Sequence, residues 1–466
     1  MPKLLPESDQ LIRLQLLLSL FRPVPPEWFT DANEPPPQPP VEALECYTYA
    51  ELVDAWSDTR DEPDGKKGAL VWQESIDVAF SLMLSVIAST KQQGAQLWLR
   101  VIGPPGSAKS SLCLAVEACQ EYVKALSMLT GFHSGQGGND LWSELDGKCC
   151  VINEGDMLVT APNRDQTLAQ MRDSWTGKVT AHYRNGVSYT RTGLRIPFIV
   201  AGTMTLRRLN RSAAGDRFLD IQLEEDNKVR GPAGTNLKLL KHIFSMEMED
   251  GLAESDGKPE SQSSAEQLFA TRKTVGYIKY IRETLVKDLN RIVIPEWVPL
   301  ACVQLAQLIA HMRARPDDKG EEHETEVELE NRLVKQLGRL ARCLALVLNK
   351  PAIDSEVMRR VAKVAHDTCR GTTFRTAKTL IKGPLDSSGI ATRCGYTTVT
   401  ARAAIQILLN IGWIKADTVT LESGAKGVRK GVYRLAPSAQ TLMAKLRLLL
   451  NPQQETLANA AQTHLS

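Results

Sequence analysis

A glycine-rich stretch carries the clearest signal for chemistry in this sequence. The residues Gly103, Pro104, Pro105, Gly106, Ser107, Ala108, Lys109 and Ser110 match the phosphate-binding pattern G-x-x-x-x-G-K-[ST], except that Ala108 replaces its second glycine. Small residues let backbone N–H groups close around phosphates at a helix N-terminus, and Lys109 adds a positive charge near the β and γ oxygens. Ser110 is placed to bind Mg²⁺, and Ser111 follows it in the helix. We expect ATP and Mg²⁺ here; the alternative is a glycine turn with an incidental lysine.

A second apolar segment, Cys149 to Ile152, ends in two polar residues, Asn153 and Glu154. Glu154 is placed to polarise the water that attacks ATP. Asn153 stands where an aspartate that orients the metal is expected, and an amide supplies no negative charge to Mg²⁺. We therefore expect either slow ATP hydrolysis or a contribution from Asp156, a second metal-binding candidate, that supplies the missing negative charge.

Two further residues are catalytic candidates because of their order along the chain. Thr203 ends the apolar segment Ile196 to Thr203, and its hydroxyl could orient the attacking water; the alternative is an ordinary core strand. Arg217 precedes a strand predicted over Leu219 to Leu223 and could reach the γ-phosphate bound by a neighbouring subunit. A surface arginine paired with Asp216 is the alternative interpretation.

The segment Val179 to Thr190 predicts a β-hairpin, because Asn185-Gly186 separates two runs rich in strand-forming residues. The candidate DNA-binding residues of this hairpin are Lys178, His182 and Arg184, with Tyr183 and Tyr189 available for stacking. The alternative is an edge hairpin whose charges are only solvated.

A helix-turn-helix pattern lies near the C-terminus. A helix over Ser387 to Arg393, a turn at Gly395 and a second helix from Thr397 or Thr398 to Ile411 are predicted. On the second helix we expect an apolar stripe of Val399, Ala403, Ile407 and Ile411, opposite a polar stripe of Thr398, Arg402, Gln406 and Asn410. Arg402 and Gln406 could enter a DNA groove, and the loop Glu422 to Lys430 would form a wing bearing Lys426, Arg429 and Lys430. Winged helices also contact proteins, which remains an alternative.

The surrounding elements predict an α/β protein with a parallel sheet. Helical spacing over Glu74 to Ser89 precedes a strand over Leu97 to Ile102, and a helix over Ser111 to Leu126 follows the glycine-rich turn. Strand and helix signals alternate to about residue 245, and residues 268 to 370 are helical around an acidic loop. The predicted division is an acidic, proline-rich arm (1–64), an ATPase core (65–248), a polar linker (249–267), a helical domain (268–373), a winged-helix domain (374–437) and a C-terminal helix and tail (438–466).

The charge of the chain is unevenly distributed. The 466 residues have a formal net charge of +2, but residues 1–64 hold 4 basic and 13 acidic residues, whereas residues 371–450 hold 12 basic and 3 acidic residues. A basic C-terminal segment suits a polyanion. The composition, with 43% hydrophobic and 24% charged residues, excludes a disordered or collagen-like chain.

The cysteines and apolar runs favour a cytoplasmic location. The nine cysteines lack the spacing of a metal site or a disulfide framework, so we expect them to be reduced core residues. The apolar runs are too short to span a membrane, and the N-terminus lacks the features of a secretory signal.

In order and spacing, Gly103 to Ser110, Ile152 to Asp156, the hairpin around Asn185-Gly186 and Asp216 to Phe218 resemble the AAA+ core of minichromosome-maintenance-type helicases over roughly residues 75 to 225. The chain is also similar to phage and plasmid ATPases with the same compact core. The resemblance implies a P-loop AAA+ domain, a helical lid with Arg332 or Arg339 as nucleotide-sensing arginines, and a C-terminal winged helix. The chain departs from the helicases at Asn153 and in having a short acidic arm where they have an N-terminal DNA-binding barrel.

The leading hypothesis is a ring-forming ATPase, a hexamer by resemblance, that translocates on DNA as a replicative helicase or replication initiator of a mobile element. ATP would lie between subunits, and the acidic arm could bind another replication protein. One alternative is a nucleotide-gated helicase loader or DNA-binding regulatory switch with little turnover, for which Asn153 is the motivating residue. Another is an ATPase that acts on protein.

Overall fold

A five-stranded parallel sheet is the central element of the fold. The computed structural model describes residues 41–58, 68–92, 94, 96–126, 144–161, 164–182, 188–211, 217–224, 265–316, 325–327, 330–421 and 428–451. The sheet has the order β2-β3-β6-β1-β7, and every neighbouring pair is parallel. Its strands are β1 (Trp98–Ile102), β2 (Val123–Ala125), β3 (Cys149–Ile152), β6 (Phe198–Gly202) and β7 (Phe218–Gln222). The prediction of an α/β fold with a parallel sheet is confirmed.

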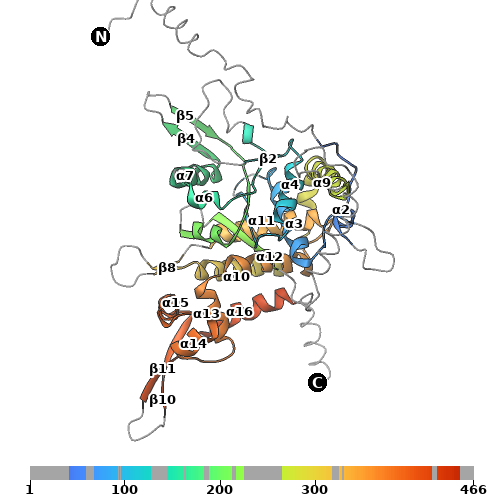
Figure 1. Ribbon diagram of the computed structural model, residues 1–466. Coiled ribbons are helices and arrows are strands. Elements are labelled where there is room, and N and C mark those ends of the chain that lie inside the picture. The colour runs from blue at the N-terminus through green and yellow to red at the C-terminus, as the bar shows by residue number, and fades with distance from the viewer. Residues whose placement is uncertain are drawn as a thin grey trace, which may run out of the picture. The chain divides into compact units, whose positions relative to one another are not determined.

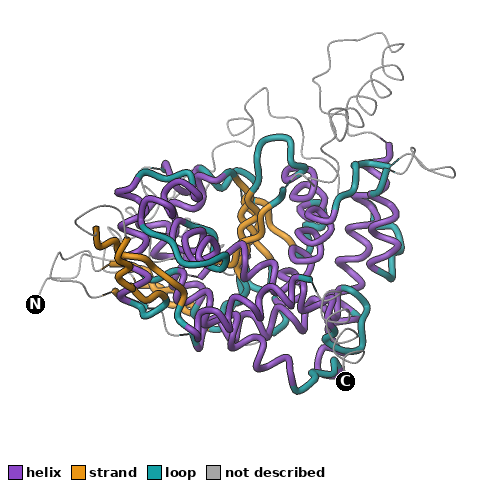
Figure 2. The backbone as a smooth tube through the Cα atoms, turned by 90° about the horizontal axis from the view of Figure 1, so that it is seen from below, coloured by secondary structure: helices purple, strands orange, loops and turns teal. Residues whose placement is uncertain are grey.

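The central strands are apolar because helices cover both faces of the sheet. All residues of β1, β3 and β6 are buried. Leu99 and Val101 point into a core shared with α3 (Glu74–Ser89), α4 (Lys109–Glu117), α9 (Ala265–Glu283) and α11 (Asn331–Val347). Trp98 and Ile102 point into a second core with α6 (Met157–Thr160), α7 (Arg164–Trp175) and the 3-10 helix η2 (Met204–Arg211). Figure 2 shows the strands enclosed by helices.

The helix after the glycine-rich turn is shorter than its sequence predicts. The prediction of one helix over Ser111 to Leu126 is wrong, because α4 ends at Glu117 and Val123–Ala125 form β2. In β2, Val123 pairs with Cys149 of β3. This pairing joins segments far apart in the sequence, so local helical periodicity does not reveal it.

A buried ion pair joins β1 to β7. Arg100 and Asp220 lie opposite each other in the register, and Nε of Arg100 is 2.7 Å from Oδ1 of Asp220. Their side chains are 0% and 1% exposed, so neither charge is hydrated. The guanidinium also donates to the carbonyl of Leu206, and the backbone N–H of Asp220 donates to the hydroxyl of Thr368. The pair therefore links the sheet to η2 and to α12 (Ser355–Thr368).

We expect Asp220→Asn to lower the free energy of unfolding by about 3–5 kcal/mol, because it leaves the buried Arg100 guanidinium without its counter-charge. Urea unfolding followed by circular dichroism measures the change. The matched control is Asp417→Asn, which breaks the half-exposed pair of Asp417 with Arg434 and should cost about 1 kcal/mol or less. Equal effects of the two substitutions would contradict this account of the ion pair.

Residues 41–58 belong to the folded part of the chain rather than to a separate arm. Helix α2 (Tyr49–Trp56) packs on α9, and the indole N–H of Trp56 donates to the hydroxyl of Thr274 at 3.0 Å. The N–H of Leu44 donates to the carbonyl of Arg272. This backbone approach requires Gly276, where an added Cβ would lie 1.7 Å from the carbonyl oxygen of Leu44. Residues 1–40 lie outside the described residues.

The region predicted to be helical over 268–370 is helical in the structure. It contains α9, the 3-10 helix η5 (Leu285–Arg291), α10 (Trp297–Met312), α11 and α12. Two short strands, β8 (Arg315–Pro316) and β9 (Thr325–Glu326), pair antiparallel. Strand β9 falls within the acidic loop predicted over Asp317 to Glu328, and residues 317–324 and 328 of that loop lie outside the described residues. Helix α12 packs against β7 and α11 packs against α3, which attaches the helical region to the sheet.

The C-terminal region consists of helices and one long hairpin. Its helices are α13 (Thr372–Leu380), α14 (Ser387–Cys394), α15 (Thr398–Asn410) and α16 (Pro437–Leu450). Strands β10 (Ile414–Leu421) and β11 (Val428–Leu435) pair antiparallel and extend beyond α13 and α14 in Figure 1. The predicted boundaries of α14 and α15 hold, because Asp386 caps α14 and the hydroxyl of Thr397 accepts the N–H of Thr400 at the start of α15.

All nine cysteines are buried and free, as the sequence predicts. Burial raises the pKa of the Cys46 thiol to about 11 and of the Cys343 thiol to about 12. These thiols are therefore protonated at neutral pH and pack as small apolar groups. Within the described residues, no helix has the length and apolar character that a membrane span requires.

Candidate nucleotide and DNA sites

The glycine-rich loop connects β1 to α4 at the carboxyl edge of the sheet. Its backbone turns through two left-handed residues, Gly106 at φ +75° and Ala108 at φ 62°. Ala108 is the residue that departs from the motif, and it adopts a conformation that favours glycine. Gly103 is also constrained, because an added Cβ would lie 2.6 Å from Oγ of Ser107. The loop ends directly at Lys109, the first residue of α4.

Lys109 bonds to the loop that precedes it. Its Nζ donates to the carbonyl oxygens of Gly103 at 2.8 Å and Pro104 at 2.6 Å, and to Oγ of Ser107 at 3.1 Å. Partial burial lowers the pKa of Lys109, and the negative charge of Asp156 opposes that shift. Pro104, Pro105 and Gly106 are exposed, as is Ser110 in the first turn of α4. The exposed surface of the loop therefore carries a cation at a helix N-terminus.

Three neighbouring strands bring their terminal residues to the same edge. Ile102 lies opposite Gly202 at the ends of β1 and β6, and Ile152 of β3 lies opposite Val200. Because the strands are parallel, the residues that follow them, Gly103, Asn153 and Thr203, emerge together. Glu154 is exposed beside the half-buried Asn153. The glycine-rich loop, Asn153, Glu154 and Thr203 thus share one edge of the sheet.

Asp156 is held against Thr203. Both carboxylate oxygens of Asp156 accept the backbone N–H of Thr203, at 3.0 and 3.2 Å, and Oγ1 of Thr203 accepts the N–H of Thr205. Two glycines that the sequence analysis did not single out permit this approach. A Cβ at Gly202 would lie 2.9 Å from Oδ1 of Asp156, and one at Gly155 would lie 2.2 Å from a methyl group of Val200.

Asn153 carries a buried polar atom that no described residue satisfies. Its side-chain oxygen Oδ1 lacks a hydrogen-bond partner. Such an atom costs about 1–3 kcal/mol when unsatisfied, so it suits a site completed by a ligand. An amide oxygen is a hard donor of the kind that Mg²⁺ accepts, and the Ser110 hydroxyl follows the loop. Among the described residues, no group of three or more His, Cys, Asp or Glu side chains could hold a metal.

Arg217, Arg332 and Arg339 lie at the edge of the sheet where the strands begin, opposite Lys109. Arg217 immediately precedes β7, and its guanidinium lies 5.6 Å from the ring centre of Trp175; that of Arg332 lies 5.9 Å from the same ring. The guanidinium of Arg339 lies beside Gly94, just before β1. None of them faces the glycine-rich loop of its own chain. The shared contact with Trp175 is a long-range feature that the sequence analysis missed.

The predicted hairpin is present as β4 (Lys178–His182) and β5 (Ser188–Thr192), with Lys178 opposite Thr192 and His182 opposite Ser188. Lys178 is exposed at the start of β4, and His182 ends it. Arg184, Tyr183 and the Asn185-Gly186 turn lie outside the described residues. The hairpin packs on α7.

The polar stripe predicted on α15 is exposed, but the predicted apolar stripe is wrong. Thr398, Arg402, Gln406 and Asn410 are all exposed. The buried side chains are Ala401, Ala404, Ile405 and Leu408, whereas Val399 is 74% exposed. The buried stripe thus lies one or two positions along the helix from the predicted one. Contacts with α13 and α14 determine which face of α15 is buried, and the positions of its β-branched residues do not. Asn410 accepts from the Gln406 amide at 2.8 Å.

Two of the three basic residues of the predicted wing are described by the structure, and both lie in a strand. Arg429 and Lys430 lie in β11, paired with Thr420 and Val419, so their placement in a loop is wrong. Lys426 lies outside the described residues. β-Branched residues, Thr418 to Thr420 in β10 and Val428 in β11, favour strand pairing that extends further than the sequence predicts.

No family model and no curated protein matches this sequence. Among solved structures, the chain is similar to a full-length MCM homolog from Methanopyrus kandleri, with a TM-score of 0.33 and 12% sequence identity. The match covers 64% of this chain and 56% of that chain, so it spans little more than half of that protein's length.

Proposed function

We propose that this protein is an ATPase of the AAA+ type whose P-loop is Gly103 to Ser110. The observation that carries this proposal is the position of Lys109. It opens α4 directly after a left-handed Ala108, with its ammonium bonded over the loop and with Glu154 and Thr203 at the ends of neighbouring strands. This combination provides a cation, backbone donors, a carboxylate and a hydroxyl at one exposed edge, as phosphoryl transfer to water requires.

Each residue has a distinct part in the proposed reaction. The N–H groups at the start of α4 and the Lys109 ammonium bind the phosphates, with Ser107 and Ser111 close to them. Glu154 accepts a proton from the attacking water, and the Thr203 hydroxyl orients that water while Asp156 fixes the Thr203 backbone. Ser110 and the Asn153 oxygen would hold Mg²⁺, which when bound neutralises charge on the phosphate oxygens, with Asp156 close by.

The protein completes its site by assembling as a homo-oligomer, which we propose to be a hexameric ring. The arginines at the opposite edge of the sheet support this, because Arg217, Arg332 and Arg339 lie far from the glycine-rich loop of their own chain. In a head-to-tail ring these arginines would face the glycine-rich loop of the neighbouring subunit. Arg217 would then stabilise charge on the γ-phosphate of the neighbouring subunit.

DNA is the proposed partner. Lys178, His182 and Arg184 of the β4–β5 hairpin would contact a strand in the ring, and the exposed Arg402 and Gln406 of α15 would contact a groove, with α14, α15 and the β10–β11 hairpin acting as a winged helix. The protein is then a replicative helicase or replication initiator of a mobile element such as a phage or plasmid. The proline-rich N-terminal segment that precedes the folded part, residues 1–40, is the proposed contact for another replication protein.

A strand-displacement assay tests the motor function. A forked DNA duplex with one labelled strand is incubated with the full chain, Mg²⁺ and ATP or ADP. We expect the wild type to displace the labelled strand with ATP but not with ADP. The Lys109→Ala variant should displace no strand with either nucleotide. Absence of displacement together with ATP-dependent assembly would favour a second candidate, a nucleotide-gated loader or regulatory switch. The uncharged side chain of Asn153, whose oxygen is buried at the end of β3 where a metal-binding carboxylate is expected, is the observation that favours that candidate.

We expect Asn153→Asp to raise the rate of ATP hydrolysis by about tenfold, because a carboxylate at this position adds one charged interaction with Mg²⁺. Phosphate release at varied Mg²⁺ concentration measures the effect, and the half-saturating Mg²⁺ concentration should fall. Asn153→Ala is the control, and it should raise that concentration. If both variants show the wild-type Mg²⁺ dependence, Asn153 lies outside the metal site.

A further inference from the structure

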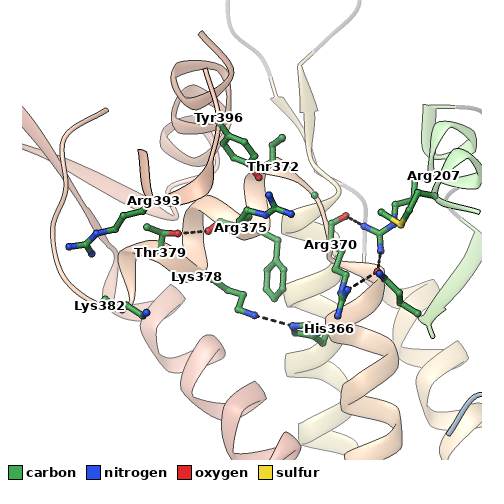
Figure 3. Close-up of a pocket in the computed structure, with 14 residues that line it drawn as sticks. Arg207, His366, Arg370, Thr372, Arg375, Lys378, Thr379, Lys382, Arg393 and Tyr396 are labelled. Atoms are coloured by element: carbon green, nitrogen blue, oxygen red, sulfur yellow. Dashed lines mark hydrogen bonds between the residues drawn. The ribbon is translucent and has the colours of Figure 1, made fainter. Parts of the chain in front are cut away.

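A basic pocket lies between the sheet and the C-terminal helices. None of the residues assigned above lines it, but Met204, which does, directly follows Thr203. Its volume is about 950 Å³, and η2, the end of β7, α12, α13 and α14 line it. Six of its lining residues are cations: Arg207, Arg370, Arg375, Lys378, Lys382 and Arg393. Among the described residues that line it, none is acidic (Figure 3).

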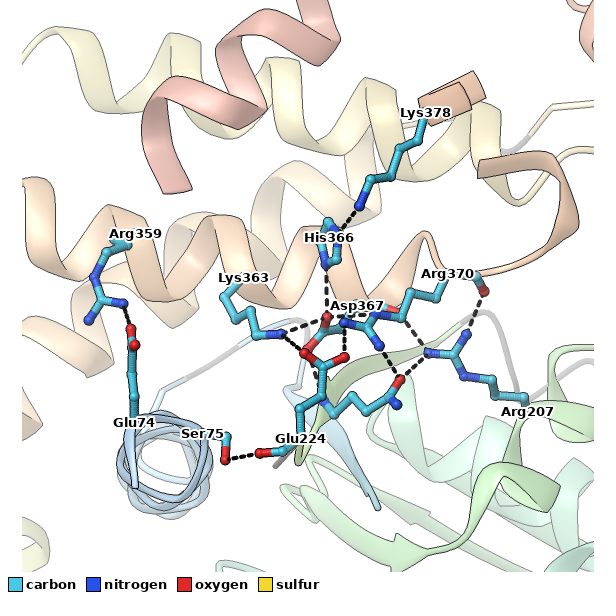
Figure 4. Close-up of polar contacts among 11 residues, drawn as sticks. Glu74, Ser75, Arg207, Glu224, Arg359, Lys363, His366, Asp367, Arg370 and Lys378 are labelled. Carbon is cyan, nitrogen blue, oxygen red and sulfur yellow. Dashed lines mark hydrogen bonds and ion pairs between the residues drawn. The ribbon is translucent and has the colours of Figure 1, made fainter. Parts of the chain in front are cut away.

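Two of these cations form a fixed inner wall. Arg370 pairs with Glu224 and with Asp367 at 3.0 Å, and it donates to Oε1 of Gln222 at 2.6 Å. Arg207 donates to the carbonyl oxygens of Arg370 and Asp367, at 2.7 and 3.1 Å. Figure 4 shows this network between η2, β7 and α12. The carboxylates lie behind the wall, so they hold the arginines without lining the pocket.

The other four cations have no carboxylate partner among the described residues. Arg375 donates to the carbonyl of Cys394, and its guanidinium lies 5.4 Å from the ring centre of Tyr396. Lys378 contacts the imidazole of His366 at 3.3 Å. Lys382 and Arg393 are exposed. Partial burial and the nearby Arg370 lower the pKa of Lys378, and the negative charges of Glu224 and Asp367 oppose that shift.

This arrangement fits an anion with several separated charges. Cations that line a concave wall raise the local concentration of anions, and guanidinium groups match phosphate oxygens with paired donors. Their spread over three elements exceeds what one phosphate needs, and Tyr396 adds a ring on which a base can stack. A volume in the range of small-ligand sites suits a few nucleotides of one strand rather than a duplex.

We propose that this pocket binds the phosphodiester backbone of a single DNA strand. The inference rests on the proposed function in taking DNA as the partner, and it adds a binding site that neither the β4–β5 hairpin nor α15 provides. A strand held there contacts the core through Arg207 and the C-terminal helices through Arg375, Lys382 and Arg393, so it bridges the ATPase domain and the C-terminal region.

Fluorescence anisotropy of a labelled oligothymidylate with the full chain tests the proposal, with Lys382→Gln/Arg393→Gln as the pocket variant. Two lost phosphate contacts should weaken binding by about tenfold or more and reduce the slope of log affinity against log salt by about 1.4. The matched control is Lys445→Gln/Arg447→Gln on α16, outside the pocket, which should retain the wild-type slope. Lys382→Gln alone, at an exposed position, should give half of the change in slope.

The outcomes separate this proposal from the proposed function. If the wild type binds the oligonucleotide but the pocket variant matches the α16 control, the pocket proposal is overturned while DNA remains the partner. If the wild type binds no DNA, both fail. Displacement of the oligonucleotide by free tripolyphosphate in the wild type but not in the pocket variant would support phosphate recognition in the pocket. Equal displacement in both would overturn it.

Discussion

Lys109→Ala should weaken ATP binding about a hundredfold. The substitution removes an ammonium that is held over the loop by three hydrogen bonds at 2.6–3.1 Å. Hydrogen bonds of a charged donor contribute about 1.5–3 kcal/mol, and about 2.7 kcal/mol corresponds to a factor of a hundred. Equilibrium titration with a fluorescent ATP analogue measures the dissociation constant directly.

A surface lysine provides the matched control for this substitution. Lys124 lies on β2 of the same sheet and pairs with Glu144, with 39% of its side chain exposed. Lys124→Ala should leave ATP affinity unchanged, since Lys124 lies outside the loop between β1 and α4. Equal affinities of the Lys109 and Lys124 variants would show that ATP binds elsewhere or does not bind.

Glu154→Gln should reduce the rate of ATP hydrolysis by about 10²–10⁴-fold while ATP affinity stays near that of the wild type. The glutamine keeps the size of the exposed side chain at the end of β3 but cannot accept a proton from water. Single-turnover phosphate release measures the chemical step separately from binding.

The comparison with Lys109→Ala assigns the two residues to different steps. The Lys109→Ala variant should bind ATP weakly, whereas the Glu154→Gln variant should bind ATP normally and hydrolyse it slowly. Glu144→Gln is the control for loss of a carboxylate, and it should hydrolyse ATP at the wild-type rate because Glu144 contacts Lys124 instead. Normal turnover by Glu154→Gln would exclude Glu154 as the base and leave Asp156 as the candidate carboxylate.

The parts of the fold that depend on local sequence could be predicted. The loop, its lysine and the flanking strand β1 follow one another directly, so a short motif contains all of them. The bounds of α3 agree with prediction because helical spacing covers its whole length, and the start of α15 agrees because Thr397 caps it. The apolar strands β3 and β6 were predictable because helices cover them on both faces.

The features that depend on long-range pairing were missed. Nothing local indicates that Arg100 meets Asp220 across the sheet or that Arg217 shares Trp175 with Arg332. Strand β2 forms because β3 is available as its partner, and its three residues are too short for a period-2 signal. The basic pocket gathers residues from Arg207 to Arg393, so only the folded chain reveals it.

Steady-state phosphate release from Mg²⁺ and ATP, with and without single-stranded DNA, tests the central claim most directly. The account predicts turnover by the full chain that DNA stimulates, with stimulation lost in both Lys109→Ala and Glu154→Gln. Turnover that DNA leaves unchanged would contradict the coupling of the P-loop to DNA. Absence of both turnover and ATP binding would contradict the assignment of Gly103 to Ser110 as a nucleotide site.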